Sequence, residues 1–235
     1  MKNDCDMHSP NIKMLKTVAA GLGDLKDKVV FVGGAVAELY AEDPAASDIR
    51  PTLDVDCIIE MSSRTKYAKL EEELRAKGFS NDNSPGASIC RWIYKSLKVD
   101  VMPTDEKILG FSNKWYIEGI KNKIKKDIDK DSSIFIFSPV YYLAAKLEAH
   151  KHRGGKDIRQ SHDFEDIVYL LDNYPNILED IDNEISRVRN YLKKACTVLL
   201  NNPNLNEGIE SALPYGSGEQ RVLMIRNIIE RLGKY

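Results

Sequence analysis

The sequence is poor in cysteine, in long apolar runs and in net charge. Its four cysteines are scattered over 235 residues and form no C-x-x-C pair. This pattern predicts reduced thiols and excludes a disulfide framework or a cysteine zinc site. No apolar run approaches the ~20 residues that a membrane-spanning helix needs, and the first ten residues lack the apolar core of a secretory signal. We therefore expect a cytoplasmic protein with no membrane segment.

Positive and negative charges are nearly balanced. The chain has 34 Lys and Arg against 36 Asp and Glu, for a net charge of −2, and a pI near 6.1. A strongly basic nucleic-acid-binding protein is not indicated, although a local basic patch can still hold RNA. A hydrophobic content of 43% with 30% charged residues is typical of a folded globular protein and argues against disorder.

A glycine pair begins the most informative stretch of the chain. A short apolar run over residues 29–32 ends in Gly33 and Gly34 and is followed by helical apolar periodicity over residues 35–40. The pattern predicts a strand, a tight turn and a helix. Glycine lets the backbone approach a phosphate, and a helix N-terminus adds its N–H groups and dipole. A glycine pair alone is also typical of an ordinary tight turn.

Two aspartates open the next predicted strand. Asp54 and Asp56 are two residues apart, so their side chains should point to the same face of the sheet. Like charges this close repel each other unless a cation lies between them. Carboxylate oxygens suit Mg²⁺, which takes one or two carboxylates together with substrate phosphates. A solvated strand end is the structural alternative.

A third carboxylate lies in a predicted hairpin further along the chain. Residues 90–94 and 98–102 have the composition of two strands, joined by a tight turn at residues 95–96. The second strand alternates polar and apolar residues and carries one carboxylate, Asp100. A lone aspartate in an alternating strand usually faces solvent, so the importance of Asp100 depends on the pair upstream.

Together these motifs resemble the signature of the DNA polymerase beta-like nucleotidyltransferase superfamily. The form Arg-x-Thr-x-Asp-x-Asp, here Arg50-Pro-Thr52-Leu-Asp54-Val-Asp56, is closest to the AbiEii/AbiGii-type toxin nucleotidyltransferases. The resemblance implies an α/β (α+β) nucleotidyltransferase core, with a mixed twisted sheet flanked by helices, followed by a C-terminal helical domain. We expect the core in residues 1–137 and the helical domain in residues 138–235.

The resemblance also implies a role for each matching residue. Asp54 and Asp56 would hold two Mg²⁺ ions, with Mn²⁺ as the alternative metal, and Asp100 would bind the ion that activates the acceptor. The nucleotide would be bound by residues of the glycine turn and of the segment before the aspartate strand, namely Gly33, Gly34, Arg50 and Thr52.

A second block of the chain adds two more candidates. AAKLEAHKHRGGKD with SHDFEDI resembles the second recurrent block of the AbiEii-type family, in which a helix lysine and downstream aspartates face the active site. The resemblance implies that Lys146 contacts the triphosphate and that Asp163 is the acidic residue, with Asp157 and Asp166 as alternatives. An ion pair between two helices is the structural alternative for Lys146.

The function implied is metal-dependent transfer of an NMP from an NTP to an acceptor hydroxyl. The acceptor would be RNA, such as the tRNA 3′ end, or a protein, and the chain would be the toxin of a toxin–antitoxin pair with a cognate antitoxin. One alternative is a non-catalytic nucleotide- or partner-binding protein on the same fold. However, a site that no longer catalyses a reaction has no evident reason to keep clustered like charges. Another is a nucleotide-sugar transferase, which would explain neither the glycine pair nor Asp100.

The last part of the chain is predicted to be helical and carries no sign of chemistry. The apolar periodicity predicts one long amphipathic helix over residues 177–201 and a final helix that begins at Ser217. Gln220, three residues after Ser217, would complete a capping box at the start of that final helix.

Overall fold

The computed structural model describes residues 9–42, 49–155 and 157–234. Their contacts divide the chain into two compact units. The first unit runs up to Val36 and adds Arg50–Ser112 and Lys123–Phe137, whereas the second contains Ala37–Ile49, Asn113–Asn122 and the chain from Ser138 onward. One boundary of this division falls between Phe137 and Ser138, and two earlier segments belong with the helices of the second unit.

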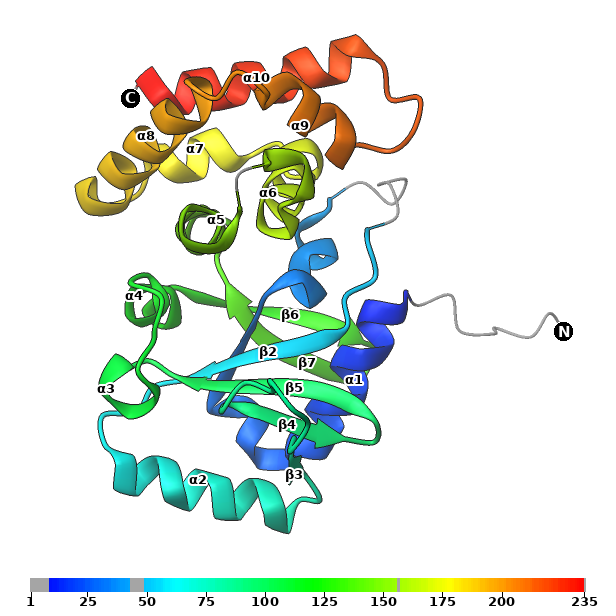
Figure 1. The fold of residues 1–235 in the computed structure, drawn as a ribbon, viewed down its shortest axis with the longest axis vertical. Coiled ribbons are helices and arrows are strands. Elements are labelled where there is room, and N and C mark those ends of the chain that lie inside the picture. The colour runs from blue at the N-terminus through cyan, green and yellow to red at the C-terminus, as the bar shows by residue number, and fades with distance from the viewer. Residues whose placement is uncertain (1–8, 43–48, 156, 235) are drawn as a thin grey trace, which may run out of the picture. The chain divides into compact units, whose positions relative to one another are not determined.

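A mixed seven-stranded sheet forms the centre of the first unit (Figure 1). The strand order is β3-β4-β5-β2-β1-β7-β6. β2 is parallel to β5 and antiparallel to β1, and β1 is parallel to β7. The α/β class with a mixed sheet is therefore as expected. The strands are β1 (Val29–Val32), β2 (Asp54–Ile59), β3 (Ser80–Asn81), β4 (Arg91–Tyr94), β5 (Leu97–Pro103), β6 (Lys123–Asp129) and β7 (Ser132–Phe137).

The central strands are the apolar runs of the sequence. All four residues of β1 are buried, as suits a β-branched and aromatic run with neighbours on both edges. In β2 the side chains at positions 55 and 57 are buried, whereas those of Asp54 and Asp56 are only partly covered. This alternation puts the two carboxylates on the accessible face of an otherwise apolar strand.

Three helices and a short 3₁₀ helix complete the first unit. They are α1 (Pro10–Leu22), η1 (Gly23–Asp27), α2 (Arg64–Ala76) and α3 (Glu106–Leu109). The start of α1 is the one the sequence predicts, because the Ser9 hydroxyl accepts from the Ile12 N–H at 3.1 Å and Pro10 is the first helical residue. In α2 the Tyr67 hydroxyl donates to the Val101 carbonyl at 3.1 Å, which fixes this helix against β5.

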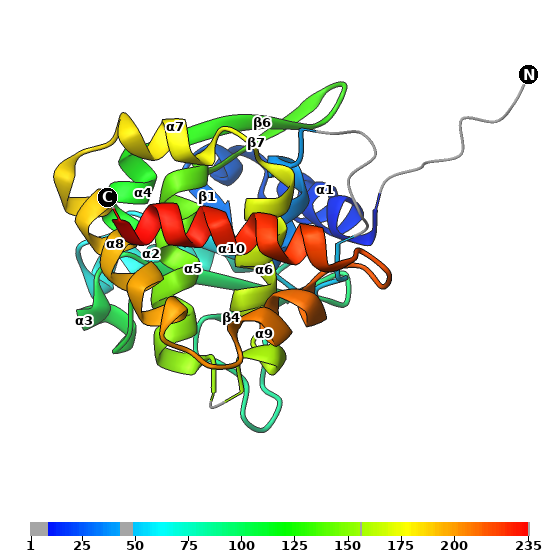
Figure 2. The ribbon, with the colours of Figure 1, turned by 90° about the horizontal axis from the view of Figure 1, so that it is seen from above.

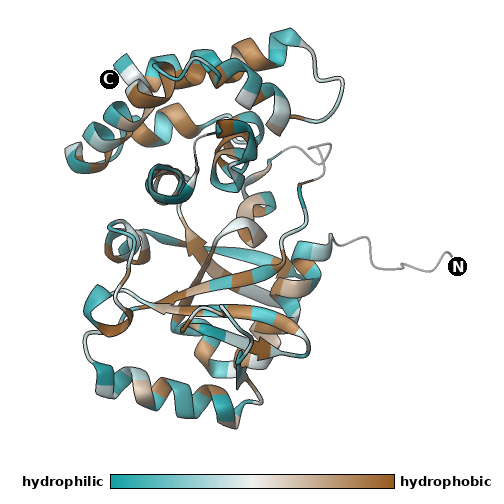
Figure 3. Ribbon diagram, in the orientation of Figure 1, coloured by the Kyte–Doolittle hydropathy of each residue, from teal (hydrophilic) through white to brown (hydrophobic). Residues whose placement is uncertain are grey.

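The second unit is helical. It contains α4 (Tyr116–Lys121), α5 (Pro139–Arg153), η3 (Ile158–Gln160), α6 (His162–Asn173), α7 (Ile177–Asp182), α8 (Ser186–Leu200), α9 (Leu205–Ala212) and α10 (Glu219–Lys234). α10 packs against α8 and α9, which lie beside it in Figure 2. Hydrophobic and hydrophilic residues alternate along α10 (Figure 3), as expected of a helix that buries one side. In the described part of the chain, no helix is long and apolar enough to cross a membrane.

Three predicted helices differ from the structure. Residues 35–40 form a 3₁₀ helix, η2 (Gly34–Tyr40), instead of an α-helix. The long helix expected over residues 177–201 is two helices, because Ile185 is extended and the Glu184 carboxylate accepts from the Tyr141 hydroxyl at 3.3 Å. The last helix begins at Glu219, since Gly218 has φ = +79° and cannot be helical.

The cysteines in the described residues are free thiols. Cys57, Cys90 and Cys196 are all buried, and burial raises the pKa of Cys90 to about 11 and that of Cys196 to about 12. These thiols are therefore protonated and unreactive at neutral pH. Cys5 lies outside the described residues.

Candidate functional site

The sheet of the first unit places three carboxylates on one face. In the parallel pair of β2 and β5, Asp56 lies opposite Asp100 and Asp54 lies opposite Lys98. Residues opposite each other on adjacent strands point to the same side, and residues two apart on one strand do so as well. Asp54, Asp56 and Asp100 therefore share one face, which we call the carboxylate face.

An arginine on the neighbouring strand lies between two of these carboxylates. Arg91 of β4 is the partner of Asp100 in the antiparallel pair of β4 and β5. Its Nε donates to Asp100 Oδ1 at 2.8 Å and its Nη2 to Asp100 Oδ2 at 2.7 Å. The same Nη2 donates to Asp54 Oδ2 at 3.0 Å. One guanidinium thus neutralises part of the repulsion that three close carboxylates would otherwise feel.

The environment of Arg91 holds it in its charged form. Its hydrogen bonds to Asp100 raise the pKa of the guanidinium above its already high value, and the charges of Asp100, Asp54 and Asp56 act in the same direction. Only 21% of its side chain is exposed, against 11% for Asp100 and 30% for Asp54. A partly desolvated bidentate pair of this kind is stronger than an exposed ion pair.

Gly33 lies directly against the third carboxylate. Val32 and Asp56 are opposite each other in the antiparallel pair of β1 and β2, so the turn after β1 passes over Asp56. A Cβ added to Gly33 would lie 2.0 Å from Asp56 Oδ2, and Gly33 has φ = +77°. Both the space and the backbone conformation therefore require glycine at this position.

A buried asparagine fixes the segment that leads into β2. Asn11 of α1 is 1% exposed. Its side-chain amide donates to the Arg50 carbonyl at 3.3 Å, and its Oδ1 accepts from the Thr52 N–H at 3.0 Å. The Thr52 hydroxyl in turn donates to Asp54 Oδ1 at 3.2 Å. Of the two residues predicted to bind the nucleotide, Thr52 thus contacts Asp54 directly, whereas Arg50 is held two residues earlier through its backbone carbonyl.

The donor chemistry of the carboxylate face fits Mg²⁺. Carboxylate oxygens are the ligands this ion prefers, and Asp54 and Asp56 supply the usual one or two. Among the residues that the structure describes, no three or more His, Cys, Asp or Glu side chains are grouped closely enough to hold a metal ion. Asp54 and Asp100 are instead both paired with Arg91.

The other two predicted site residues belong to the second unit, where they pair with each other. Lys146 of α5 is 7% exposed, and its Nζ lies 3.2 Å from Asp163 Oδ1 and 2.5 Å from Asp166 Oδ2, both on α6. Arg153 also donates to Asp163, from its Nε at 2.8 Å. Asp157 instead forms an exposed ion pair with Arg159. The structural alternative for Lys146, an ion pair between two helices, is therefore present, and its contact with a triphosphate stays a prediction.

Asp163 is stabilised in its ionised form by this cluster. Burial would raise its pKa, but the hydrogen bond from Arg153 and the charge of Lys146 outweigh burial and hold the pKa below the ordinary value of 3.8. A lowered folded-state pKa means that Asp163 stabilises the fold at pH values above 3.8 and that this stabilisation is lost as the pH falls below it.

We expect Lys146→Met to lower the free energy of unfolding by about 3–5 kcal/mol, because it leaves two buried carboxylates without their shared cation. Urea unfolding followed by circular dichroism measures this change. Lys151→Met is the matched control, since Lys151 is on the same helix and exposed, and we expect it to change stability by less than about 0.5 kcal/mol. Equal stability of the two variants would contradict the structural role of Lys146.

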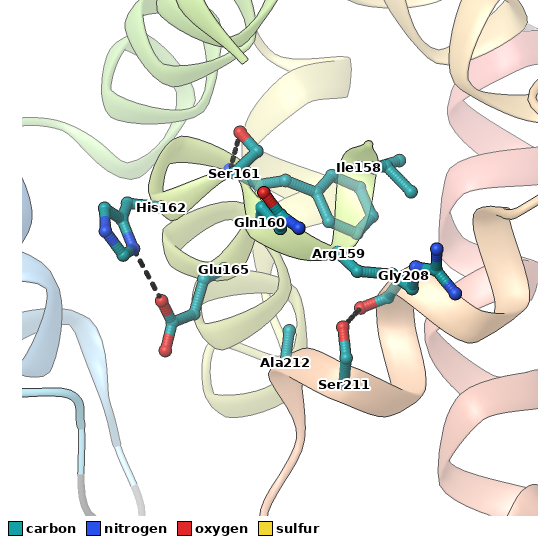
Figure 4. Close-up of a pocket in the computed structure, with 10 residues that line it drawn as sticks. Ile158, Arg159, Gln160, Ser161, His162, Glu165, Gly208, Ser211 and Ala212 are labelled. Carbon is teal, nitrogen blue, oxygen red and sulfur yellow. Dashed lines mark hydrogen bonds and ion pairs between the residues drawn. The ribbon is translucent and has the colours of Figure 1, made fainter. Parts of the chain in front are cut away.

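A small pocket in the second unit does not include the predicted site residues. It has a volume of about 130 Å³ and lies between η3, the start of α6 and α9 (Figure 4). Two of its hydroxyls have partners within the lining, since the Ser161 hydroxyl caps α6 through the Phe164 N–H and the Ser211 hydroxyl donates to the Gly208 carbonyl. Nothing in its lining matches the chemistry predicted from the sequence.

No protein-family model matches the chain, and a search of curated proteins finds none that matches it. The resemblance to nucleotidyltransferases therefore rests on the local sequence motifs.

Two residues that support the carboxylate face, Arg91 and Asn11, were not predicted from the sequence. Arg91 could have been found from the hairpin alone, because a two-residue turn at residues 95–96 pairs position 91 with position 100. Both turn residues, Lys95 and Ser96, have positive φ, as such a hairpin turn requires. No sequence pattern indicated Asn11, because its hydrogen bonds to Arg50 and Thr52 depend on how α1 packs beside the segment before β2.

Proposed function

We propose that this chain is a metal-dependent nucleotidyltransferase that moves an NMP from an NTP to an acceptor hydroxyl. The observation that supports this most strongly is the shared face of Asp54, Asp56 and Asp100, with the Gly33 turn in contact with Asp56. Neither a generic strand end nor a lone Asp-x-Asp pair accounts for all of these features.

Each residue of the face has a role in this proposal. Asp54 and Asp56 would hold two Mg²⁺ ions, or Mn²⁺, and Asp100 would complete the ligands on the side of the acceptor hydroxyl. Bound Mg²⁺ supplies positive charge that stabilises the attacking and leaving oxygens of an in-line displacement. Gly33 and Gly34 let the backbone come close to the phosphates, and Arg50 and Thr52 would bind the nucleotide. The acceptor oxygen forms a bond to the α-phosphorus, and pyrophosphate leaves.

The residues of the second unit enter the proposal only through the resemblance. Lys146 would contact the triphosphate, with Asp163 as its acidic partner. For that contact its ammonium has to exchange a carboxylate of Asp163 or Asp166 for a phosphate oxygen. The acceptor we propose is an RNA hydroxyl, such as the tRNA 3′ end, or a protein hydroxyl, and an antitoxin would be the partner that silences the activity.

A non-catalytic nucleotide-binding protein is a second candidate, and Arg91 favours it. The bidentate pair of Arg91 with Asp100 offsets part of the negative charge of the cluster without a metal. A site that has lost turnover could therefore keep its three carboxylates at a reduced electrostatic cost, contrary to the expectation from the sequence.

One experiment separates these two functions. Purified protein is incubated with Mg²⁺, each α-³²P-labelled NTP in turn, and total cellular RNA or protein, and the products are separated on denaturing gels. We expect one NTP to label one class of acceptor, and Asp54→Asn to abolish the labelling. NTP binding without any labelled acceptor would refute the transferase and support the binding protein.

A further inference from the structure

The positive charge that contacts the carboxylate face belongs to a side chain of the protein, Arg91. The Arg91 guanidinium uses three N–H groups to contact both oxygens of Asp100 and one oxygen of Asp54. Asp54 Oδ1 is engaged as well, by the Thr52 hydroxyl at 3.2 Å. A metal ion that is to bind Asp100, or to bridge Asp100 and Asp54, needs the same oxygens that Arg91 occupies.

We propose that Arg91 is a resident counter-cation of the carboxylate face, and that it competes with divalent cations for Asp54 and Asp100. This inference rests on the part of the proposed function in which the face binds a divalent cation. It assigns Arg91 a positioning role, since the residue acts through the two carboxylates and sets how readily the face accepts metal.

The fixed position of Arg91 makes this competition strong. The residue lies directly opposite Asp100 in the ladder of β4 and β5, and four-fifths of its side chain is covered, given an exposed fraction of 21%. Two like charges held close together at a partly buried site repel each other strongly, because water screens them less there. The guanidinium must therefore move away, or the ion must bind more weakly.

The inference predicts that removal of the guanidinium tightens metal binding. Mn²⁺ is titrated into metal-free protein, and the free ion is counted by its electron paramagnetic resonance signal, with no nucleotide or acceptor present. We expect Arg91→Met to bind Mn²⁺ on the order of tenfold or more tightly than the unmodified chain. Arg91→Lys, which keeps the charge and loses the planar fork, should lie between the two, and it carries the test if Arg91→Met does not fold.

Lys98→Met is the matched control for charge. Lys98 is the partner of Asp54 in the pair of β2 and β5 and is exposed. Its removal takes one positive charge from the same face without breaking the Arg91 contacts. We expect it to change Mn²⁺ affinity by less than about threefold, because exposed charges are screened by water and salt.

A second readout follows thermal unfolding. In EDTA, Arg91→Met should unfold at a lower temperature than the unmodified chain, because its three carboxylates repel one another. Added Mg²⁺ should then raise its midpoint more than that of the unmodified chain, by mass action on the folded state.

If Arg91→Met binds Mn²⁺ no more tightly than the unmodified chain, the proposed competition is refuted. It is also refuted if neither protein binds Mn²⁺. Tighter Mn²⁺ binding together with no nucleotidyl transfer by the unmodified chain would leave this inference standing and refute the proposed function. Transfer activity with unchanged Mn²⁺ affinity would refute this inference alone.

Discussion

Gly33→Ala is expected to abolish nucleotidyl transfer and to destabilise the first unit. The new Cβ would lie 2.0 Å from Asp56 Oδ2, far inside contact distance, so the carboxylate or the turn must move. The residue would also have to keep φ = +77°, which costs an L-residue about 1–2 kcal/mol. The measurements are label transfer from an α-³²P NTP and the midpoint of urea unfolding.

Gly86→Ala is the matched control for this prediction. Gly86 also has a positive φ, +81°, but a Cβ there meets nothing within 4 Å. The control therefore carries the backbone strain without the collision with Asp56, and it should keep its transfer activity. If Gly33→Ala and Gly86→Ala lose the same stability and both remain active, the close approach of the turn to Asp56 has no role in the site.

Asp56→Asn is expected to lower the rate of nucleotidyl transfer by at least about a hundredfold. The charge that a bound metal stabilises in phosphoryl transfer is worth several kcal/mol, and each 1.4 kcal/mol is a factor of about ten in rate. In EDTA the variant should be as stable as the unmodified chain or slightly more so, because one of three close negative charges is removed.

Asp27→Asn is the matched control. It tests whether the loss of any carboxylate in the first unit lowers the rate of nucleotidyl transfer. Asp27 is exposed and forms a surface ion pair with Lys26 at 2.9 Å, so its amide variant should transfer at the normal rate. Normal transfer by Asp56→Asn would remove Asp56 from the site. A large loss of folding stability in EDTA would show that this carboxylate is structural.

Short-range signals in the sequence were enough for most of the strands and for the shared side of Asp54 and Asp56. The Ser9-Pro10 helix start and the two-residue turn at Lys95-Ser96 depend on local chemistry, and both are present. Once that turn is placed, the period of two along a strand determines which side chains share a face. It puts Asp54 and Asp56 on one side, whereas the common face with Asp100 also needs the parallel pairing of β2 with β5, which no local signal predicts.

Features that depend on packing could not be predicted in the same way. At the break between α7 and α8, Glu184 contacts Tyr141, which is more than 40 residues away in sequence. The hydrogen bonds of Asn11 with Arg50 and Thr52 likewise join α1 to a distant segment. Arg91 differs from these features, because its position opposite Asp100 follows from the local hairpin turn.

The most direct test of the central claim compares two positions of the label. The protein is given Mg²⁺, total RNA or protein as acceptor, and the same NTP labelled with ³²P at either the α- or the γ-phosphate. If the carboxylate face catalyses nucleotidyl transfer, the α-label enters the acceptor and the γ-label is released as pyrophosphate, and Asp54→Asn and Asp56→Asn prevent both. Entry of the γ-label into the acceptor, or no release or transfer of either label with any NTP, would contradict the account.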